Sequence, residues 1–204
     1  MRYSTDRFMN KEDTAIIFGT SPFINKMNKD DIQYLIDNYY HIGINTFVQD
    51  YPVKNILFSD YAMYDLIKPN IDNQNIIISQ TAYDFNFIKE NREKPKNIEY
   101  IFDANSEIFH DLSLNMLCMY KTSALPAINY AYLKNYKNII LCGVDLTQTW
   151  NHYHNTYGGC YQNRPLKRIN LMRNLLYQFK EYVNLYTLNL ESDLEIEKIG
   201  IDRL

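Results

Sequence analysis

Short apolar runs recur along the chain at intervals that leave room for a helix or a loop between them. Each run is rich in Ile, Leu, Val or Phe and is followed by a small or polar residue, a pattern that is typical of strands buried on both faces of a sheet. The predicted strands cover residues 14–18, 42–48, 55–58, 75–79, 98–102, 138–143 and 183–188.

Apolar residues spaced three or four positions apart predict amphipathic helices between these runs. Asn28 is a suitable N-cap for a helix that carries Ile32, Leu35 and Ile36 on one face. Prolines within the first turn fit two of the longer helices. The remaining predicted helices cover residues 61–67, 123–136, 165–182 and 194–199. The segment 83–96 is polar and aromatic and gives no assignable pattern.

The alternation of strands with helices predicts crossover connections and therefore a mainly parallel sheet. No internal repeat, charge block or Gly/Ser-rich linker divides the chain. A length of 204 residues suits one well-packed domain better than two. We therefore expect a single α/β domain over residues 1–204, a Rossmann-like doubly wound fold.

The composition argues against several classes of function but does not identify one. The formal net charge of −3 gives no electrostatic argument for nucleic acid as an obligate partner. The amino-terminal residues are polar, without the apolar core of a secretion signal, and no apolar run approaches the length of a membrane span. The three cysteines have no metal-binding spacing, which fits a cytoplasmic protein; they are Cys118, Cys142 and Cys160. Cys118 and Cys142 lie in apolar runs and are predicted to be core residues.

The first apolar run ends in Gly19-Thr20-Ser21-Pro22. Glycine allows a ligand to approach the backbone closely, and the two hydroxyls can bond a phosphate or a sugar. The loop matches neither a Walker sequence nor a dinucleotide-binding glycine motif, so a plain strand-to-helix turn is the alternative. Asn45 and Asp60 follow the next two runs in the same way, and their side chains suit a base or ribose edge.

Lys121-Thr122-Ser123 precedes the predicted helix that begins near Ala124. A helix start presents free N–H groups and the positive end of a dipole, which suits the phosphate of a nucleotide. Thr122 or Ser123 can equally be a simple N-cap. The two interpretations are compatible.

The richest stretch covers residues 139–157, where a buried strand breaks at a glycine and Asp145 follows. In an open α/β sheet, ligands bind beyond the carboxyl ends of the strands, so the next residues fall where a site is expected. A neutral His152 is a candidate general base, and Tyr153 or Tyr157 can donate to a departing phosphate.

A metal site at His152 and His154 would need a third ligand such as Asp145 and is only weakly indicated. No D-x-D pair is present to hold a divalent ion on a nucleotide diphosphate, which favours metal independence. We interpret His41 and His110 as ordinary helix or loop residues.

The order of these motifs resembles that of the family-42 bacterial sialyltransferases, over most of the chain from about residue 14 to 188. Their G-N-G-P-S-like first loop corresponds to 19–22, and their second-strand asparagine to Asn45. Their R-I-T-S-G segment resembles residues 120–124, their S-G-I-D segment 142–145, and their S-H-Y segment Asn151-His152-Tyr153. The chain departs from the pattern at Thr20 and Asp60, where the family has asparagines.

The resemblance implies a Rossmann-like, metal-independent glycosyltransferase that uses a CMP-sugar or another nucleotide sugar as co-substrate and needs no cofactor. It implies His152 as the base, with Tyr153 or Tyr157 assisting the leaving phosphate. The donor would be held by Gly19, Thr20, Ser21, Asn45, Asp60, Thr122, Ser123 and Asp145.

Several alternatives remain open at this point. A related Mg²⁺-dependent pyrophosphokinase-like enzyme uses a similar loop-and-helix arrangement, and a non-catalytic module that binds a nucleotide or glycan would share it too. The acceptor can be a glycan or a modified nucleobase in DNA. The aromatic content of 15% leaves room for a homo-oligomer interface.

Overall fold

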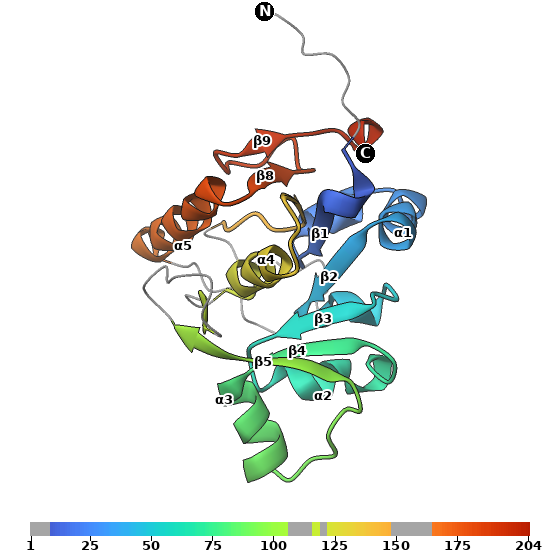
Figure 1. The fold of residues 1–204 in the computed structure, drawn as a ribbon, viewed down its shortest axis with the longest axis vertical. Helices are drawn as coiled ribbons and strands as arrows, with labels where there is room; N and C mark the ends of the chain where they lie inside the picture. The colour runs from blue at the N-terminus through green and yellow to red at the C-terminus, as the bar shows by residue number, and fades with distance from the viewer. Residues whose placement is uncertain (1–8, 106–115, 119–121, 148–164) are drawn as a thin grey trace, which may run out of the picture.

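A computed structural model describes residues 9–105, 116–118, 122–147 and 165–204 of the chain. The described part contains one parallel sheet with helices on both faces (Figure 1). The strands are β1 (Thr14–Phe18), β2 (Tyr40–Ile44), β3 (Asn55–Phe58), β4 (Asn75–Ser79), β5 (Ile98–Asn105), β6 (Met116–Cys118), β7 (Asn138–Cys142), β8 (Asn184–Thr187) and β9 (Glu197–Lys198). The helices are α1 (Lys29–Asn38), α2 (Met63–Ile67), α3 (Gln80–Tyr83), α4 (Ala124–Leu133) and α5 (Leu166–Gln178).

The nine strands lie in the order β6-β5-β4-β3-β2-β1-β7-β8-β9, and every pairing is parallel. The chain builds outward from β1 to β6 and then returns to the other side of β1 to form β7 and the remaining strands. The order therefore reverses between β1 and β7. This is the topological switch point at which doubly wound sheets bind their ligands.

Alternate residues of each central strand enter two separate cores. On β1, Ala15 and Ile17 pack with α4 and α5, whereas Ile16 and Phe18 pack with α1 and α2. All five residues of β1 are buried, as expected for a strand covered on both faces. Figure 1 shows α4 in front of the sheet and α2 behind it. The predicted Rossmann-like α/β fold is confirmed.

The strands predicted at 14–18, 55–58 and 75–79 agree with the observed bounds, and Asn28 caps α1 by accepting a hydrogen bond from the Asp30 amide. The strand predicted at 42–48 is too long. It ends at Ile44, because Asn45 has a positive φ of 53° and starts a 3₁₀ turn, Asn45–Gln49.

One other prediction is wrong, and two elements were not predicted. Residues 194–199 were predicted as a helix but contain the two-residue edge strand β9, which pairs with β8. The short strand β6 was not predicted. The unassigned segment 83–96 contains a π-helix, Asp84–Lys89, which continues α3.

None of the helices in the described ranges is long and apolar enough to cross a membrane.

Candidate site at the carboxyl edge of the sheet

The loop after β1 and the end of β7 are in direct backbone contact. The Gly19 amide donates to the Cys142 carbonyl at 2.8 Å, and the Ser21 amide donates to the Gly143 carbonyl at 2.9 Å. A Cβ on Gly19 would lie 2.2 Å from the Gly143 oxygen, closer than any real contact. Gly143 itself has a φ of +72°, which favours glycine. Both glycines are therefore required for the close approach at the switch point.

Asp145, just beyond β7, holds this loop in place. One carboxylate oxygen accepts a short hydrogen bond from the Ser21 hydroxyl, and the other accepts one from the Asn189 amide at 2.9 Å. Asn189 is oriented in turn by the Glu191 amide, which donates to its side-chain oxygen at 3.1 Å. Both oxygens of Asp145 thus have protein partners, and the carboxylate ties together the ends of β1, β7 and β8.

The residue after Asp145 also has an unusual backbone. Leu146 has a φ of +46°, in the left-handed region that costs a non-glycine residue about 1–2 kcal/mol. Its side chain is buried, and its carbonyl accepts from the guanidinium of Arg173 on α5 at 3.3 Å. This packing and hydrogen bonding offset the strain and fix the direction in which the chain leaves β7.

A second polar cluster joins the ends of β2 and β3 to the start of α4. The Ser59 and Ser123 hydroxyls lie 2.9 Å apart, and the Ser123 hydroxyl donates weakly to the Asn45 side-chain oxygen at 3.4 Å. Ser79, at the end of β4, donates to the Ser59 carbonyl at 2.9 Å. Because the Asn45 oxygen is the acceptor, its amide nitrogen remains a donor, with no partner among the described residues.

The start of α4 offers fewer amide donors than a typical helix. The Ala124 amide donates to the Thr122 hydroxyl at 3.3 Å, and the Ala127 amide donates to the Ser123 carbonyl. Pro126 has no N–H. Within the described part of the chain, Leu125 alone keeps an unpaired amide in this first turn. An anion there would rely on the helix dipole and on hydroxyls more than on a row of amides.

Asp60 is exposed at the end of β3. Its Oδ1 atom accepts from the Ala62 amide at 3.0 Å, so one carboxylate oxygen caps the turn into α2. The second oxygen has no partner in the described ranges. Thr20 is half-buried in the β1 loop.

The sequence predicted that most of these residues lie at the same edge of the sheet, but three residues of the two clusters were not predicted. Ser59, Ser79 and Asn189 take part in the two clusters and were not singled out. The signal that could have found them is that each lies at, or within two residues of, the end of a buried apolar run. The candidate base His152, its neighbour His154, and Tyr153 and Tyr157 lie outside the described residues.

Two titratable side chains near the core have structural roles. His41 was predicted to be an ordinary helix or loop residue but lies in β2 with a fractional exposure of 1%. Burial lowers the pKa of its imidazole, whose two nitrogens bond the Tyr39 carbonyl and the Lys54 amide. Cys142 is fully buried, which confirms its predicted core role, and this burial raises the pKa of its thiol.

Among the residues that the structure describes, no three His, Cys, Asp or Glu side chains form a group that could hold a metal ion.

Comparison with known proteins identifies the fold but no family. No protein-family model matches the sequence, and no curated protein matches it either. Among solved structures, the chain is similar to one described as a MAf glycosyltransferase from Magnetospirillum magneticum AMB-1, with a TM-score of 0.59 and 13% sequence identity. The match covers 94% of this chain and 34% of the other, so the chain spans about a third of that protein and shares its fold over that length.

Proposed function

We propose that the chain is a glycosyltransferase domain that transfers a sugar from a nucleotide-activated donor to an acceptor hydroxyl. The observation that carries the proposal is the close contact of the β1 loop with β7 at the switch point, beside the Asn45–Ser59–Ser123 cluster. It places backbone and hydroxyl groups where a doubly wound fold binds a nucleotide. The similarity to a solved structure named as a glycosyltransferase supports the same class.

The residues divide into groups with separate tasks. The nucleoside would lie against Gly19, Thr20 and Ser21, whose loop Asp145 holds in position. Thr122 and Ser123 would bond the phosphate at the start of α4. Asn45 would donate its free amide to the donor, and Asp60 would accept from a hydroxyl. We propose no cofactor and no metal for this reaction.

His152 would act as the general base in the transfer step. The acceptor oxygen forms a bond to the anomeric carbon while the bond from that carbon to the phosphate oxygen breaks. The acceptor proton passes to the His152 imidazole, and the phosphate leaves with the electron pair. Tyr153 or Tyr157 would donate a hydrogen bond to the leaving phosphate and stabilise its charge.

The proposal also concerns which nucleotide sugar is the donor. The resemblance to sialyltransferases favours a CMP-sugar, but Thr20 and Asp60 remove two amides that would contact such a donor. An acidic Asp60 favours a donor that presents hydroxyls rather than a carboxylate at this position, because like charges repel. We propose a glycan as the acceptor, with a modified nucleobase as the second candidate.

A donor-hydrolysis screen in the presence of EDTA tests the proposal. Wild type, His152→Ala and the neighbouring control His154→Ala would be incubated with CMP-, UDP- and GDP-sugars, and released nucleotide would be measured. We expect EDTA-resistant release from one donor, reduced about 100-fold or more in His152→Ala. The control should retain the wild-type rate.

Other outcomes would replace the proposal. Wild-type activity in His152→Ala would contradict the base assignment. Mg²⁺-dependent ATP turnover without sugar-nucleotide release would show a pyrophosphokinase-like enzyme. Tight nucleotide binding without turnover of any donor would indicate a binding module.

A further inference from the structure

An exposed tyrosine, Tyr61, packs against the half-buried Phe85 at the same edge of the sheet as the candidate site, beyond the end of β3. Tyr61 follows β3 by three residues and has 48% of its surface exposed. Its ring lies against that of Phe85, with centroids 4.2 Å apart and planes inclined by 37°. Phe85 belongs to the π-helix Asp84–Lys89, and π-helical turns are frequent at functional sites.

A buried amide bonds the backbone of Tyr61. Asn86 has a fractional exposure of 0%, and its side-chain nitrogen donates to the Tyr61 carbonyl at 3.1 Å and to the Ala82 carbonyl at 2.9 Å. Its side-chain oxygen accepts from Arg92 at 2.7 Å. The side-chain nitrogen thus links the backbone of Tyr61 to the helical segment, and the side-chain oxygen is held by Arg92.

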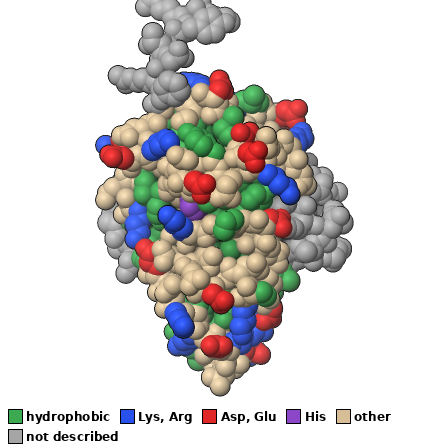
Figure 2. Space-filling view, turned by 90° about the vertical axis from the view of Figure 1, so that its right-hand side faces the viewer, with side chains coloured by type: hydrophobic (Ala, Val, Ile, Leu, Met, Phe, Trp, Pro, Cys, Tyr) green, Lys and Arg blue, Asp and Glu red, His purple; other side chains and the backbone are tan. Residues whose placement is uncertain are grey.

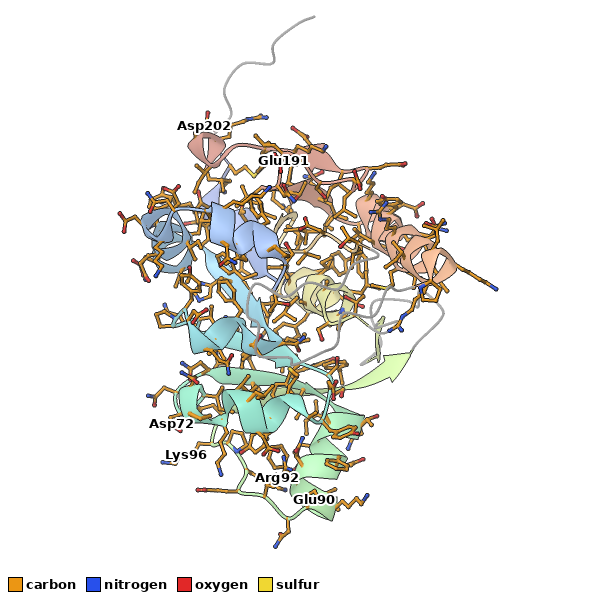
Figure 3. All side chains as sticks on the ribbon, turned by 180° about the vertical axis from the view of Figure 1, so that it is seen from behind. Asp72, Glu90, Arg92, Lys96, Glu191 and Asp202 are labelled. Atoms are coloured by element: carbon orange, nitrogen blue, oxygen red, sulfur yellow. The ribbon has the colours of Figure 1, made fainter. Side chains whose placement is uncertain are left out.

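Arg92 extends this support to the neighbouring helix. Its guanidinium forms an ion pair with Asp65 of α2 at 2.9 Å while bonding Asn86. Figure 3 shows Arg92 beside the end of the helical segment that follows β4, close to α2. An exposed ring that packs against Phe85, on a backbone fixed by a buried amide, loses less conformational entropy when a ligand covers it than a ring on a free loop would.

Each ring of the pair has a carboxylate next to it in the sequence. Asp60 precedes Tyr61 and has one carboxylate oxygen without a partner among the described residues. Asp84 precedes Phe85, and its carboxylate accepts from Gln80 at 2.7 Å. An aromatic face with hydrogen-bond acceptors in the same segments suits a ligand with an apolar ring face and hydroxyl donors, which describes a saccharide.

The aromatic pair lies to one side of the position proposed for the nucleotide. β3 is two strands from β1, which corresponds to about 10 Å across the sheet. Ser59 contacts Ser123 at the start of α4, and Tyr61 lies two residues further, at most about 7 Å along the backbone. A nucleotide at the switch point with its phosphate near α4 would therefore direct its sugar, and the acceptor beyond it, toward Tyr61.

We propose that Tyr61 and Phe85 form a stacking subsite for a saccharide ring, either the transferred sugar or the acceptor, with Asp60 accepting from a ring hydroxyl. The location of the subsite relative to the donor rests on the proposed function. The binding of a saccharide by the pair does not depend on it and can be measured separately.

The test compares saccharide and nucleotide binding by the full chain. Saturation-transfer NMR would be recorded with methyl β-galactoside, methyl β-glucoside, lactose, CMP, UMP and GMP as probes. The variants are Tyr61→Ala, the conservative Tyr61→Phe, and Tyr34→Ala as a matched control, because Tyr34 is also an exposed tyrosine, at 42%. We expect saccharide affinity to fall about tenfold in Tyr61→Ala alone, with nucleotide affinity unchanged.

Donor hydrolysis and transfer then distinguish the two sources of the saccharide. A raised KM for the donor during hydrolysis in Tyr61→Ala would place the transferred sugar on the ring. A raised KM for the acceptor alone would place the acceptor there. Either result supports the subsite.

The remaining outcomes overturn one proposal without the other. Saccharide binding that is absent in wild type, or unchanged in Tyr61→Ala, overturns the subsite even if donor hydrolysis is observed. Lost nucleotide binding with intact saccharide binding would show a base-stacking role instead. Tyr61-dependent saccharide binding without hydrolysis of any donor would leave the subsite standing and overturn the transferase.

Discussion

The two edges of the sheet use similar residues for different purposes. At the amino edge, where the strands begin, polar side chains bond one another. Asn75 donates to the Asn55 side-chain oxygen at 3.1 Å, and Asn55 donates to the His41 carbonyl at 2.8 Å. On the other side of β1, Asn184 donates to the Asn138 side-chain oxygen at 2.9 Å. These amides tie neighbouring strand starts together.

The surface at this edge is mixed in charge. Figure 2 views the side of the molecule where the strands begin and shows Lys and Arg side chains interspersed with Asp and Glu. Lys134 and Glu99 form an ion pair at 2.6 Å beside the stacked rings of Tyr40 and Tyr136, whose centroids lie 4.4 Å apart. Side chains of opposite charge neutralise one another here, which is typical of a surface that serves stability.

The carboxyl edge leaves hydrogen-bonding capacity open. Among the described residues, the Asn45 amide nitrogen and one Asp60 carboxylate oxygen have no partner and Tyr61 exposes its ring, while Asp145 and Ser123 are bonded within the protein. Among the described non-glycine residues with a positive φ, only Leu146 is not an asparagine, and it lies at this edge. The comparison shows polar side chains bonded to neighbouring strands at the amino edge, and more open hydrogen-bonding groups among the described residues of the carboxyl edge, as the proposed function requires.

Gly19→Ala should have the largest effect, because it disrupts the contact between the β1 loop and β7 at the carboxyl edge. The new Cβ would overlap the Gly143 carbonyl oxygen at 2.2 Å, and backbone atoms cannot move away as a side-chain end can. We expect a loss of about 3 kcal/mol in the free energy of unfolding, measured by urea denaturation, and loss of nucleotide binding.

The control for this variant is Gly200→Ala. Its Cβ would meet the side-chain oxygen of Asp202, which can rotate into solvent. We expect a change within about 0.5 kcal/mol. Equal destabilisation by the two variants would contradict the role assigned to the contact between the β1 loop and β7.

Substitutions at the two ends of β3 compare the effects of the two edges on stability and on nucleotide binding. Asn55→Ala at the start of the strand removes a donor to the His41 carbonyl and an acceptor for Asn75. The buried His41 carbonyl loses its donor, whereas the exposed Asn75 can bond water instead. We therefore expect a loss of about 2 kcal/mol in unfolding free energy, most of it from the His41 carbonyl. Nucleotide affinity of the folded protein should not change.

Ser59→Ala, just after the same strand, should affect nucleotide binding more than stability. The half-buried hydroxyl contributes less to stability, and we expect a loss of about 1 kcal/mol or less, with a several-fold loss of nucleotide affinity measured by calorimetry. If Asn55→Ala weakened nucleotide binding while Ser59→Ala left it intact, the division between the edges would be wrong.

The smallest effect concerns pH and His41. Burial lowers the pKa of this imidazole in the folded state below the ordinary value near 6.5. Between the two values the unfolded chain binds a proton that the folded chain does not, so stability falls as the pH decreases below about 6.5. The dependence is at most about 1.4 kcal/mol per pH unit.

His41→Gln should flatten this dependence, measured as the difference between the urea-unfolding curves of variant and wild type from pH 7 to pH 5. The other histidines contribute equally to both proteins and cancel in the difference. A slope that is the same in variant and wild type would show that His41 takes up its proton equally in the folded and unfolded states.

Regular patterns made parts of the fold predictable. The strands at 14–18, 55–58 and 75–79 are apolar runs buried on both faces, and no competing turn residue interrupts them. The strand at 42–48 was overextended because Thr46, Phe47 and Val48 are β-formers that the 3₁₀ turn buries instead. The π-helix was unassignable because its period differs from that of both helix and strand.

By itself, the sequence determined the α/β class, the positions of most strands, the Gly19–Ser21 loop and the placement of Asp145 beyond a strand end. Only the tertiary structure decided which of these groups meet. Asn189 reaches Asp145 because β8 lies beside β7, and Asn86 reaches Tyr61 because β4 lies beside β3. Ser59 reaches Ser123 because the start of α4 lies at the carboxyl edge of the sheet. Such contacts join residues far apart in the chain, and hydrophobic periodicity fixes which face of an element is buried but not which element lies beside it.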